Sequence, residues 1–160
     1  MIQIYDDKYK QEVIDLILHI QNVEYGVGIS IEDQTDLLDI NRNYIECGGC
    51  FWVALNEEGK VVGSIGVQIK TKEIAVLKKL FVYKEYRGKE IGIGQKLYDL
   101  VIDFAKSKNI STIFLDSPDK TKRAHNFYRK SGFVEIGKEE LPIAYDYPDR
   151  NSLIFRLDLI

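Results

Sequence analysis

The sequence predicts an α/β domain in which helices lie on both faces of a mixed β-sheet. The chain has 160 residues, 45% of them hydrophobic and 29% charged, which is typical of a globular protein that buries a sizeable core. Strand-length apolar segments alternate with amphipathic helical segments in the second half of the chain. No internal repeat, low-complexity tract or long linker interrupts it, so we expect one domain over residues 1–160.

The first 45 residues predict a strand followed by two helices. Residues 2–5 are a short apolar segment typical of a strand. Residues 8–24 carry apolar side chains at helical spacing, namely Val13, Leu16, Ile17, Ile20 and Val23. The segment "YGVGIS" ends that helix. Ser30 and Asp33 form a plausible capping pair, so a second helix is expected over roughly residues 33–45.

Three strands are expected next. Residues 50–70 contain two apolar runs joined by "NEEG", which is typical of a β-hairpin. Residues 73–83 are rich in β-branched and aromatic side chains and predict a long strand. Cys47 and Cys50 flank two glycines before the hairpin. A redox pair at this spacing belongs at the start of a helix that follows a strand, so a turn followed by a buried thiol is the better interpretation.

The remaining segments alternate between helix and strand. Residues 94–109 place Leu97, Leu100, Val101 and Phe104 on one helical face. The other expected elements are, in order, a buried strand at 111–117, a helix at 119–132 that Gly132 ends, and closing strands at 133–137 and 152–159. The predicted order is therefore β-α-α-β-β-β-α-β-α-β-β.

Charge and composition exclude several classes of function. The net charge is −3, from 22 basic and 25 acidic residues, so we expect no nucleic-acid partner. The N-terminus shows no secretory signal, and no apolar run reaches the ~20 residues of a membrane span. We therefore expect a cytoplasmic protein without a membrane partner. Besides the two cysteines, only His19 and His125 could complete a zinc site, and they lie far apart in sequence, so no metal is expected.

A glycine-rich stretch, "EYRGKEIGIGQKLYD" at residues 85–99, lies between the long strand and an amphipathic helix. The first N–H groups of a helix lack intrahelical partners and attract anions, and glycine lets a phosphate approach the backbone. Arg87 and Lys89 add positive charge. A flexible turn with surface basic residues is the alternative. The stretch does not contain the P-loop pattern G-x-x-x-x-G-K-[ST]. It also fails the dinucleotide fingerprint G-x-G-x-x-G, because Leu97 occupies the place of the third glycine.

Two motifs resemble the GCN5-related N-acetyltransferases, the GNAT family. The acetyl-CoA loop of that family is [Q/R]-x-x-G-x-[G/A] before a helix; here Lys89 to Gly94 matches it with lysine in first place. Counting from the strand puts Arg87 first instead, so the basic partner of the pyrophosphate is Arg87 or Lys89. "AHNFYRKSGF" at 124–133 resembles the family's A-x-x-[LF]-Y-x-x-x-G-F segment, but Thr121 replaces the usual asparagine.

This resemblance implies a fold and an acyl donor. The implied fold is a mixed, mostly antiparallel sheet of six to seven strands flanked by about four helices, with two central strands splayed by acetyl-CoA. Acetyl-CoA is the implied donor, with no metal. The residues implied to bind it are Leu80, Phe81, Val82, Arg87, Gly88, Lys89, Gly92, Ile93, Gly94, Gln95, Thr121 and Arg123.

The resemblance also implies direct attack of a primary amine on the thioester. Tyr128 is expected to protonate the leaving thiolate, since a phenol with a pKa near 10 keeps its proton at neutral pH. Glu73, on the long strand, is the candidate base. Acidic segments rich in tyrosine predict a small cationic acceptor bound by Glu24, Asp36 and Asp146. The alternative function is a non-catalytic CoA-binding regulatory module. A homodimer is compatible with the sequence.

Overall fold

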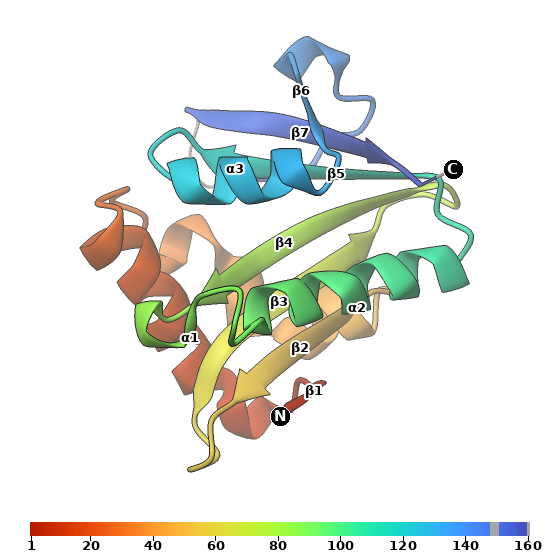
Figure 1. Ribbon diagram of the computed structural model, residues 1–160. Helices are drawn as coiled ribbons and strands as arrows, with labels where there is room; N and C mark the ends of the chain where they lie inside the picture. Colours follow the sequence, from red (N-terminus) through yellow and green to blue (C-terminus); the bar gives the residue numbers. More distant parts are fainter. Residues whose placement is uncertain (148–150, 160) are drawn as a thin grey trace.

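A single sheet of seven strands organises the part of the chain that the structure describes, in the order β1-β2-β3-β4-β5-β7-β6 (Figure 1). This structure is a computed structural model that describes residues 1–147 and 151–159. Every neighbouring pair of strands is antiparallel except β4 and β5, which are parallel. The strands are β1 (Ile2–Ile4), β2 (Cys50–Leu55), β3 (Val61–Ile69), β4 (Ile74–Val82), β5 (Thr112–Pro118), β6 (Val134–Ile136) and β7 (Ser152–Asp158).

Within residues 1–147 and 151–159, three α-helices and several shorter helical turns flank this sheet. The α-helices are α1 (Lys10–Leu18), α2 (Ile93–Ser107) and α3 (Lys122–Lys130). The 3-10 turns are Asp7–Tyr9, Ile31–Asp33, Thr35–Leu38, Lys84–Tyr86 and Lys138–Glu140, and the π-helical turns are His19–Glu24 and Asn41–Ile45. The predicted fold class is confirmed: the sheet is mixed and mostly antiparallel, and helices cover both of its faces.

One predicted helix is not a regular α-helix in the structure. The helix expected over 33–45 is a series of 3-10 and π-helical turns. The Asn43 amide donates to the carbonyl oxygens of Asp36 and Asp39, and the Tyr44 hydroxyl donates to the Asp36 carboxylate. Short polar side chains that bond the backbone in this way compete with regular helical hydrogen bonds. The helix predicted at 8–24 is present as α1 with a 3-10 turn before it and a π-helical turn after it.

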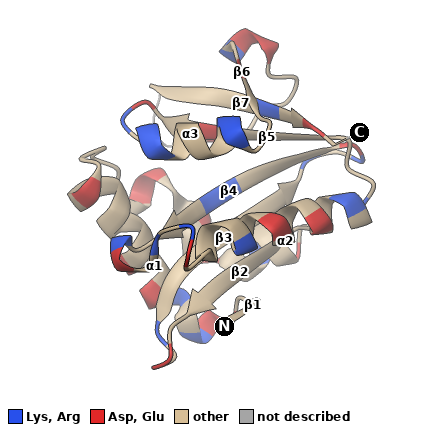
Figure 2. Cartoon of the chain, viewed as in Figure 1, with Lys and Arg blue, Asp and Glu red and all other residues tan. Residues whose placement is uncertain are grey.

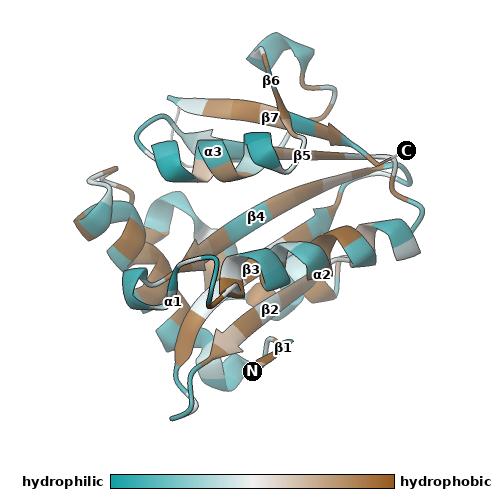
Figure 3. Ribbon diagram, viewed as in Figure 1, coloured by the Kyte–Doolittle hydropathy of each residue, from teal (hydrophilic) through white to brown (hydrophobic). Residues whose placement is uncertain are grey.

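Two cores lie on opposite faces of the sheet. The larger one packs α2 and α3 against the sheet, with Val101 and Phe155 fully buried in it. The other packs α1 and the turns of residues 35–45 against β2, with Tyr44 fully buried. Figure 3 shows the apolar colour concentrated along the strands and on the inner sides of the helices. Cys47 is exposed, Cys50 is buried, and both are free thiols, which confirms the predicted turn and buried thiol.

The parallel pair β4 and β5 is only briefly joined. Ile74, Ala75 and Val76 pair with Thr112, Ile113 and Phe114, and the two strands diverge beyond that point (Figure 1). Past the same point β4 continues to pair with β3, and β5 continues to pair with β7. The register of β3 and β4 shifts between Ser64 and Gly66, opposite Lys79, whose φ of 60° is left-handed. The divergence and this bulge shape the space between the strands.

Candidate active site

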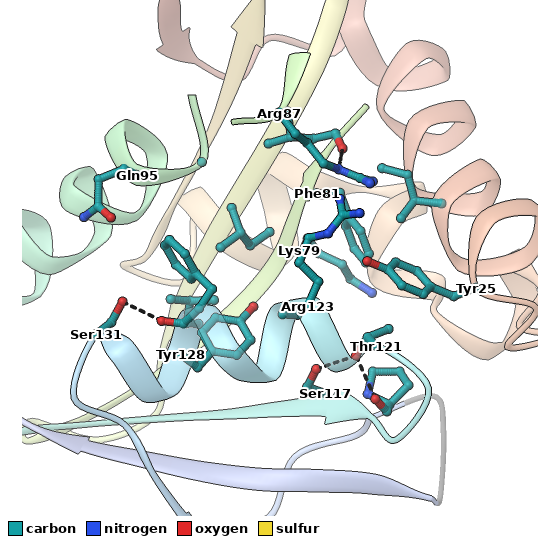
Figure 4. A pocket seen from close by; sticks show the side chains of 18 of the residues that line it. Tyr25, Lys79, Phe81, Arg87, Gln95, Ser117, Thr121, Arg123, Tyr128 and Ser131 are labelled. Atoms are coloured by element: carbon teal, nitrogen blue, oxygen red, sulfur yellow. Dashed lines mark hydrogen bonds between the residues drawn. The ribbon is translucent and has the colours of Figure 1, made fainter. Parts of the chain in front are cut away.

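A cavity of about 810 Å³ opens where β4 and β5 diverge (Figure 4). Its volume lies within the ~300–1,000 Å³ of small-molecule and cofactor sites. Its walls come from β4, the turn into α2, the end of β5, α3 and residues 20–25. We call the part lined by Arg87, Gly88, Lys89, Gly92, Gly94 and Gln95 the loop end. We call the part lined by Lys78, Lys79 and Asp116 the inner end.

The loop end offers backbone rather than side chains. Gly88 and Gly92 have φ values of 122° and 69°, a left-handed region that favours glycine, and the Gly92 N–H donates to the Gly88 carbonyl at 2.9 Å. The helix α2 begins directly after Gly92, so its first N–H groups lack intrahelical acceptors. A Cβ at Gly94 would meet no protein atom within 4 Å. Gly94 therefore leaves space for something outside the chain, as an anion-binding helix N-terminus requires.

The two basic residues of the loop end differ in their surroundings. The Arg87 guanidinium forms a two-pronged ion pair with Glu24, and its Nε donates to the Val82 carbonyl at 2.7 Å. Burial raises the pKa of Glu24, but Arg87 and Arg123 outweigh that effect and lower it. Lys89 is exposed and lines the cavity. Arg87 thus ties the loop to the end of the first helical segment, and Lys89 presents its charge to the cavity.

The predicted donor-binding residues converge on this cavity. All of them line it except Ile93, which packs towards Gly63 on β3. Thr121 lines the wall, but its hydroxyl donates to the Pro118 carbonyl at 2.7 Å and lies 2.7 Å from the Ser117 hydroxyl. Thr121 therefore stabilises the turn from β5 into α3. Figure 2 shows basic residues on α3 and in the middle of β4, and both elements contribute to the cavity wall.

Tyr128 reaches the cavity from α3 and is 6% exposed (Figure 4). Its ring packs against Phe133 and Phe155 at centroid distances of 5.7 and 6.1 Å. Burial, followed by the Asp116 carboxylate, raises the pKa of Tyr128 above the ordinary phenol value of 10.0. At neutral pH the side chain is therefore a fixed, protonated hydroxyl at the wall of the cavity.

The predicted base and acceptor residues do not line the cavity. Glu73 is exposed at the turn before β4, where its carbonyl accepts from the Ser111 and Thr112 N–H groups. That turn lies at the joined end of β4, before the strands diverge. The structure does not bring Glu73 to the site, because a strand that supplies the cavity wall at one end carries its other end away from it.

The three predicted acceptor carboxylates are also placed elsewhere. Glu24 is paired with Arg87. The Asp36 carboxylate accepts from the Tyr44 hydroxyl at 2.5 Å and lies 3.8 Å from the Lys79 Nζ. Asp146 is exposed, and its carbonyl accepts from the Lys78 Nζ at 3.0 Å. Two of these carboxylates neutralise basic residues of the protein, a pairing that a list of acidic residues could not reveal.

Asp116 is a site residue that sequence reasoning missed. It lies near the end of β5, lines the inner end and is partly buried. Burial raises the pKa of the Asp116 carboxyl, although Lys78 and Lys79 act in the opposite direction. Its signal was a carboxylate within the apolar strand "STIFLDS". A carboxyl group in such surroundings, facing a cavity, is suited to proton transfer.

Lys78 and Lys79 were also missed. Both line the inner end, and the Lys79 side chain is only 6% exposed. Burial lowers the pKa of Lys79 to about 8. Their signal was a pair of lysines inside the apolar run of residues 73–83.

In the described ranges, 1–147 and 151–159, no group of three or more His, Cys, Asp or Glu is placed to hold a metal ion. Nor is any helix of those ranges both long and apolar enough to cross a bilayer.

A splayed mixed sheet, a phosphate-type loop at a helix N-terminus and a buried tyrosine at one cavity are typical of a CoA-dependent acyltransferase. The family model described as "Acetyltransferase (GNAT) family" matches residues 14–133. The chain belongs to the GNAT acetyltransferase family. This membership confirms the resemblance seen in the sequence and identifies acetyl-CoA as the acyl donor.

Known relatives agree with this assignment. A GNAT-family acetyltransferase from Staphylococcus aureus Mu50 is 38% identical with a TM-score of 0.94, over 100% of this chain and 99% of that one. N-acetyltransferase 8B from Homo sapiens is 35% identical over 117 residues, 69% of this chain and 50% of that protein. N-acetylaspartate synthetase from Danio rerio is 36% identical over 108 residues, 66% of this chain and 37% of that protein. The chain therefore spans half or less of these two proteins.

Proposed function

We propose that this protein transfers the acetyl group of acetyl-CoA to a small primary amine. One observation carries the proposal. A single cavity brings together the glycine loop at the start of α2, the diverging edges of β4 and β5, and the hydroxyl of Tyr128. Family membership supports acetyl-CoA as the donor. The cavity wall supplies groups that could bind the donor and groups that could transfer protons.

The loop end fits the phosphates of the donor. The backbone N–H groups that begin α2, next to Gly92, would bind the pyrophosphate, and the open space at Gly94 would let it approach. Lys89, rather than Arg87, would supply the positive charge, because Arg87 already binds Glu24. The edge of β4 from Leu80 to Val82 would bond the pantetheine arm. When bound, acetyl-CoA supplies the thioester carbonyl that the amine attacks and the thiolate that leaves.

Two residues would move the protons of this reaction. Asp116 would accept a proton from the acceptor's ammonium, since its raised pKa makes it a better base than an exposed aspartate. Tyr128 would donate its proton to the departing sulfur, since its raised pKa keeps the phenol protonated until that moment. The second proton that the attacking nitrogen loses on forming the amide would return to the Tyr128 oxygen. Asp116 takes the place that the sequence predicted for Glu73, and it also supplies the carboxylate that a cationic amine needs.

A small-molecule acceptor is supported by the relatives. The zebrafish relative is named for the product N-acetylaspartate, which is an acetylated amino acid. The inner end adjoins the residue 20–25 wall, where Tyr25 lines the cavity, so a compact amine would have room beside Asp116. The ammonium of such an amine would meet Asp116 rather than Glu24, Asp36 or Asp146.

A panel of amines tests this function. Purified protein is mixed with acetyl-CoA and each amine, and free CoA is measured spectroscopically with a thiol reagent. Release of CoA that depends on an amine supports the transferase. Binding of CoA by calorimetry without release for any amine would instead favour a non-catalytic CoA-binding module.

A further inference from the structure

Lys79 has a backbone conformation that lysine seldom adopts. Its φ of 60° is left-handed, and it lies in the β4 bulge, where the register with β3 shifts. The Ser64 hydroxyl donates to the Lys79 carbonyl at 2.7 Å and stabilises this geometry. Bulges commonly redirect a side chain beside an active site. The residues of β4 from Leu77 to Val82 all line the cavity, and Lys78 and Lys79 are the charged ones among them.

A buried polar network supports the Lys79 ammonium from behind. Its Nζ donates to the Gln34 Oε1 at 2.7 Å and lies 3.8 Å from an Asp36 oxygen. Gln34 in turn exchanges two hydrogen bonds with Gln21, at 2.6 and 3.2 Å, and both amides are buried. The hydroxyl of Tyr44 donates to Asp36 at 2.5 Å. Each side chain of this network is fixed by another, so the ammonium is positioned before any ligand arrives.

The charge at the inner end does not match the donor. The acetyl and pantetheine parts of acetyl-CoA are uncharged, and its phosphates belong at the loop end, ten residues further along the chain. Lys78 and Lys79 therefore have no anion to bind on the donor. Asp36 offsets part of the Lys79 charge from 3.8 Å, but the Lys78 ammonium is bound to a carbonyl and would still repel the ammonium of a simple amine. An acceptor that brings its own anion removes this conflict.

The acceptor must then carry two opposite charges. Asp116 lies beside Lys78 and Lys79 and would face the amine, while the lysines would face an anion attached to the same molecule. Lysine binds carboxylates as a point charge with three donors, of which Gln34 uses one. A carboxylate is the anion that accompanies an amine in the smallest molecules of this kind, amino acids.

We infer that Lys79 binds the carboxylate of an amino-acid acceptor and thereby determines acceptor specificity. This inference rests on the proposed transferase function and adds the class of acceptor to it. Lys78 lies at the same end of the cavity and is held by the Asp146 carbonyl at 3.0 Å, and its ammonium lies 5.3 Å from the Tyr145 ring centroid. It would contribute to the positive potential there.

Matched pairs of acceptors test the inference. CoA release is measured with L-amino acids and with the corresponding amino-acid amides, which keep the amine and lose the carboxylate charge. The wild type is expected to prefer the acids at least tenfold in kcat/KM. The Lys79→Met variant keeps a long side chain without the charge. It should lose that preference through a higher KM for the acid, with KM for acetyl-CoA changed less than twofold.

Control measurements separate the explanations. Lys106→Met removes an exposed lysine of α2 and should keep the preference. Thermal unfolding of each variant reports folding damage. Equal use of acids and amides by the wild type, or an equal loss for both acceptors in Lys79→Met, would overturn the role of Lys79 and leave the transferase function intact.

The inference stays testable if no amine in the panel is acetylated. That result overturns the proposed function itself. Calorimetry of the same L-amino acids against CoA-loaded protein then decides about Lys79. Binding that is lost in Lys79→Met supports the carboxylate site, and binding that is absent or unaffected overturns it.

Discussion

At the loop end of the cavity a ligand would meet backbone N–H groups and glycines, whereas at the inner end it would meet the side chains of Lys78, Lys79 and Asp116. The residues of the loop end all lie within one continuous stretch of the chain, 87–95. The inner end depends on two strands and on the buried network of residues 21–44. A backbone site can bind the phosphates that every acetyl-CoA molecule carries, and a side-chain site can be changed one residue at a time to fit a different acceptor. The comparison predicts that variants at the two ends affect different substrates.

The largest effect is expected between the two ends, at Tyr128. Tyr128→Phe keeps the ring contacts with Phe133 and Phe155 but removes the proton donor. A general acid contributes about 10² to 10⁴ in rate, so kcat should fall by more than about 10², with both KM values changed little. Steady-state and single-turnover kinetics measure this. A wild-type rate in single turnover, with chemistry limiting, would reduce Tyr128 to a packing residue.

Asp116→Asn should give the next largest loss, about 10² in kcat/KM for the acceptor. In the wild type, kcat/KM should rise with pH as Asp116 loses its proton. That rise should be centred above the ~3.9 of an ordinary aspartate, because burial raises the pKa. The variant should lack this dependence. Asp146→Asn, which changes an exposed carboxylate outside the cavity, is the matched control and should stay within about twofold of wild type.

Gly94→Val tests the loop end with a smaller expected effect. The φ of Gly94 is not left-handed, and a Cβ there meets no protein atom, so stability should change by less than about 1 kcal/mol. The valine would occupy the space meant for phosphate. The Kd for CoA, measured by calorimetry, should rise at least ~10-fold, equivalent to about 1.4 kcal/mol.

Gly59→Val is the control for Gly94→Val. Gly59 lies in the β2–β3 turn, away from the cavity, with a φ of 77°. Because valine is strained at a left-handed φ, the Gly59→Val variant should lose about 1–2 kcal/mol of stability without losing CoA affinity. Normal CoA affinity in Gly94→Val would refute the loop assignment.

The smallest effects are expected from the two basic residues of the loop. Lys89→Ala should raise KM for acetyl-CoA several-fold, and the difference from wild type should shrink with added salt, because an exposed charge is screened. Arg87→Ala should chiefly cost stability, about 1–2 kcal/mol, since it removes charged hydrogen bonds to Glu24. If Arg87→Ala, and not Lys89→Ala, caused a large salt-dependent rise in KM for acetyl-CoA, Arg87 would be the phosphate-binding residue instead of Lys89.

The pH dependence of stability sharpens that difference. The folded-state pKa of Glu24 is lowered from its ordinary 4.5, so the folded state favours the ionised carboxylate. The stabilisation by Arg87 is therefore complete above pH 4.5 and is lost as pH falls through the lower, folded-state value. Urea unfolding of wild type and Arg87→Ala should show a gap at neutral pH that closes in acid. Glu24→Gln should lose stability similarly, and the double variant should cost less than the sum of both.

Most site residues predicted from local signals are ones that the structure brings to the cavity. The glycines, Lys89 and Tyr128 lie in continuous motifs, and the strands of the second half are marked by apolar runs. The helix expected over 33–45 was wrong because the side chains of Asn43 and Tyr44 bond to Asp36 and Asp39. The inner end could not be predicted, because Lys79 meets Gln34 and Asp36 from 45 and 43 positions away. The sequence alone does not show whether an acidic residue faces a substrate or a lysine.

The short pairing between β4 and β5 also makes the sheet two half-sheets joined along a narrow seam. Among the described residues, the pairs of Ile74–Val76 with Thr112–Phe114 are the ones that connect β1–β4 to β5–β7 in the ladder, and no described strand lies between the facing edges beyond them. A donor whose amide groups bond both edges would act as the missing eighth strand. Its binding free energy would then add to the cohesion of the fold as RT ln(1 + [L]/Kd). The free energy of unfolding would therefore increase with the concentration of acetyl-CoA.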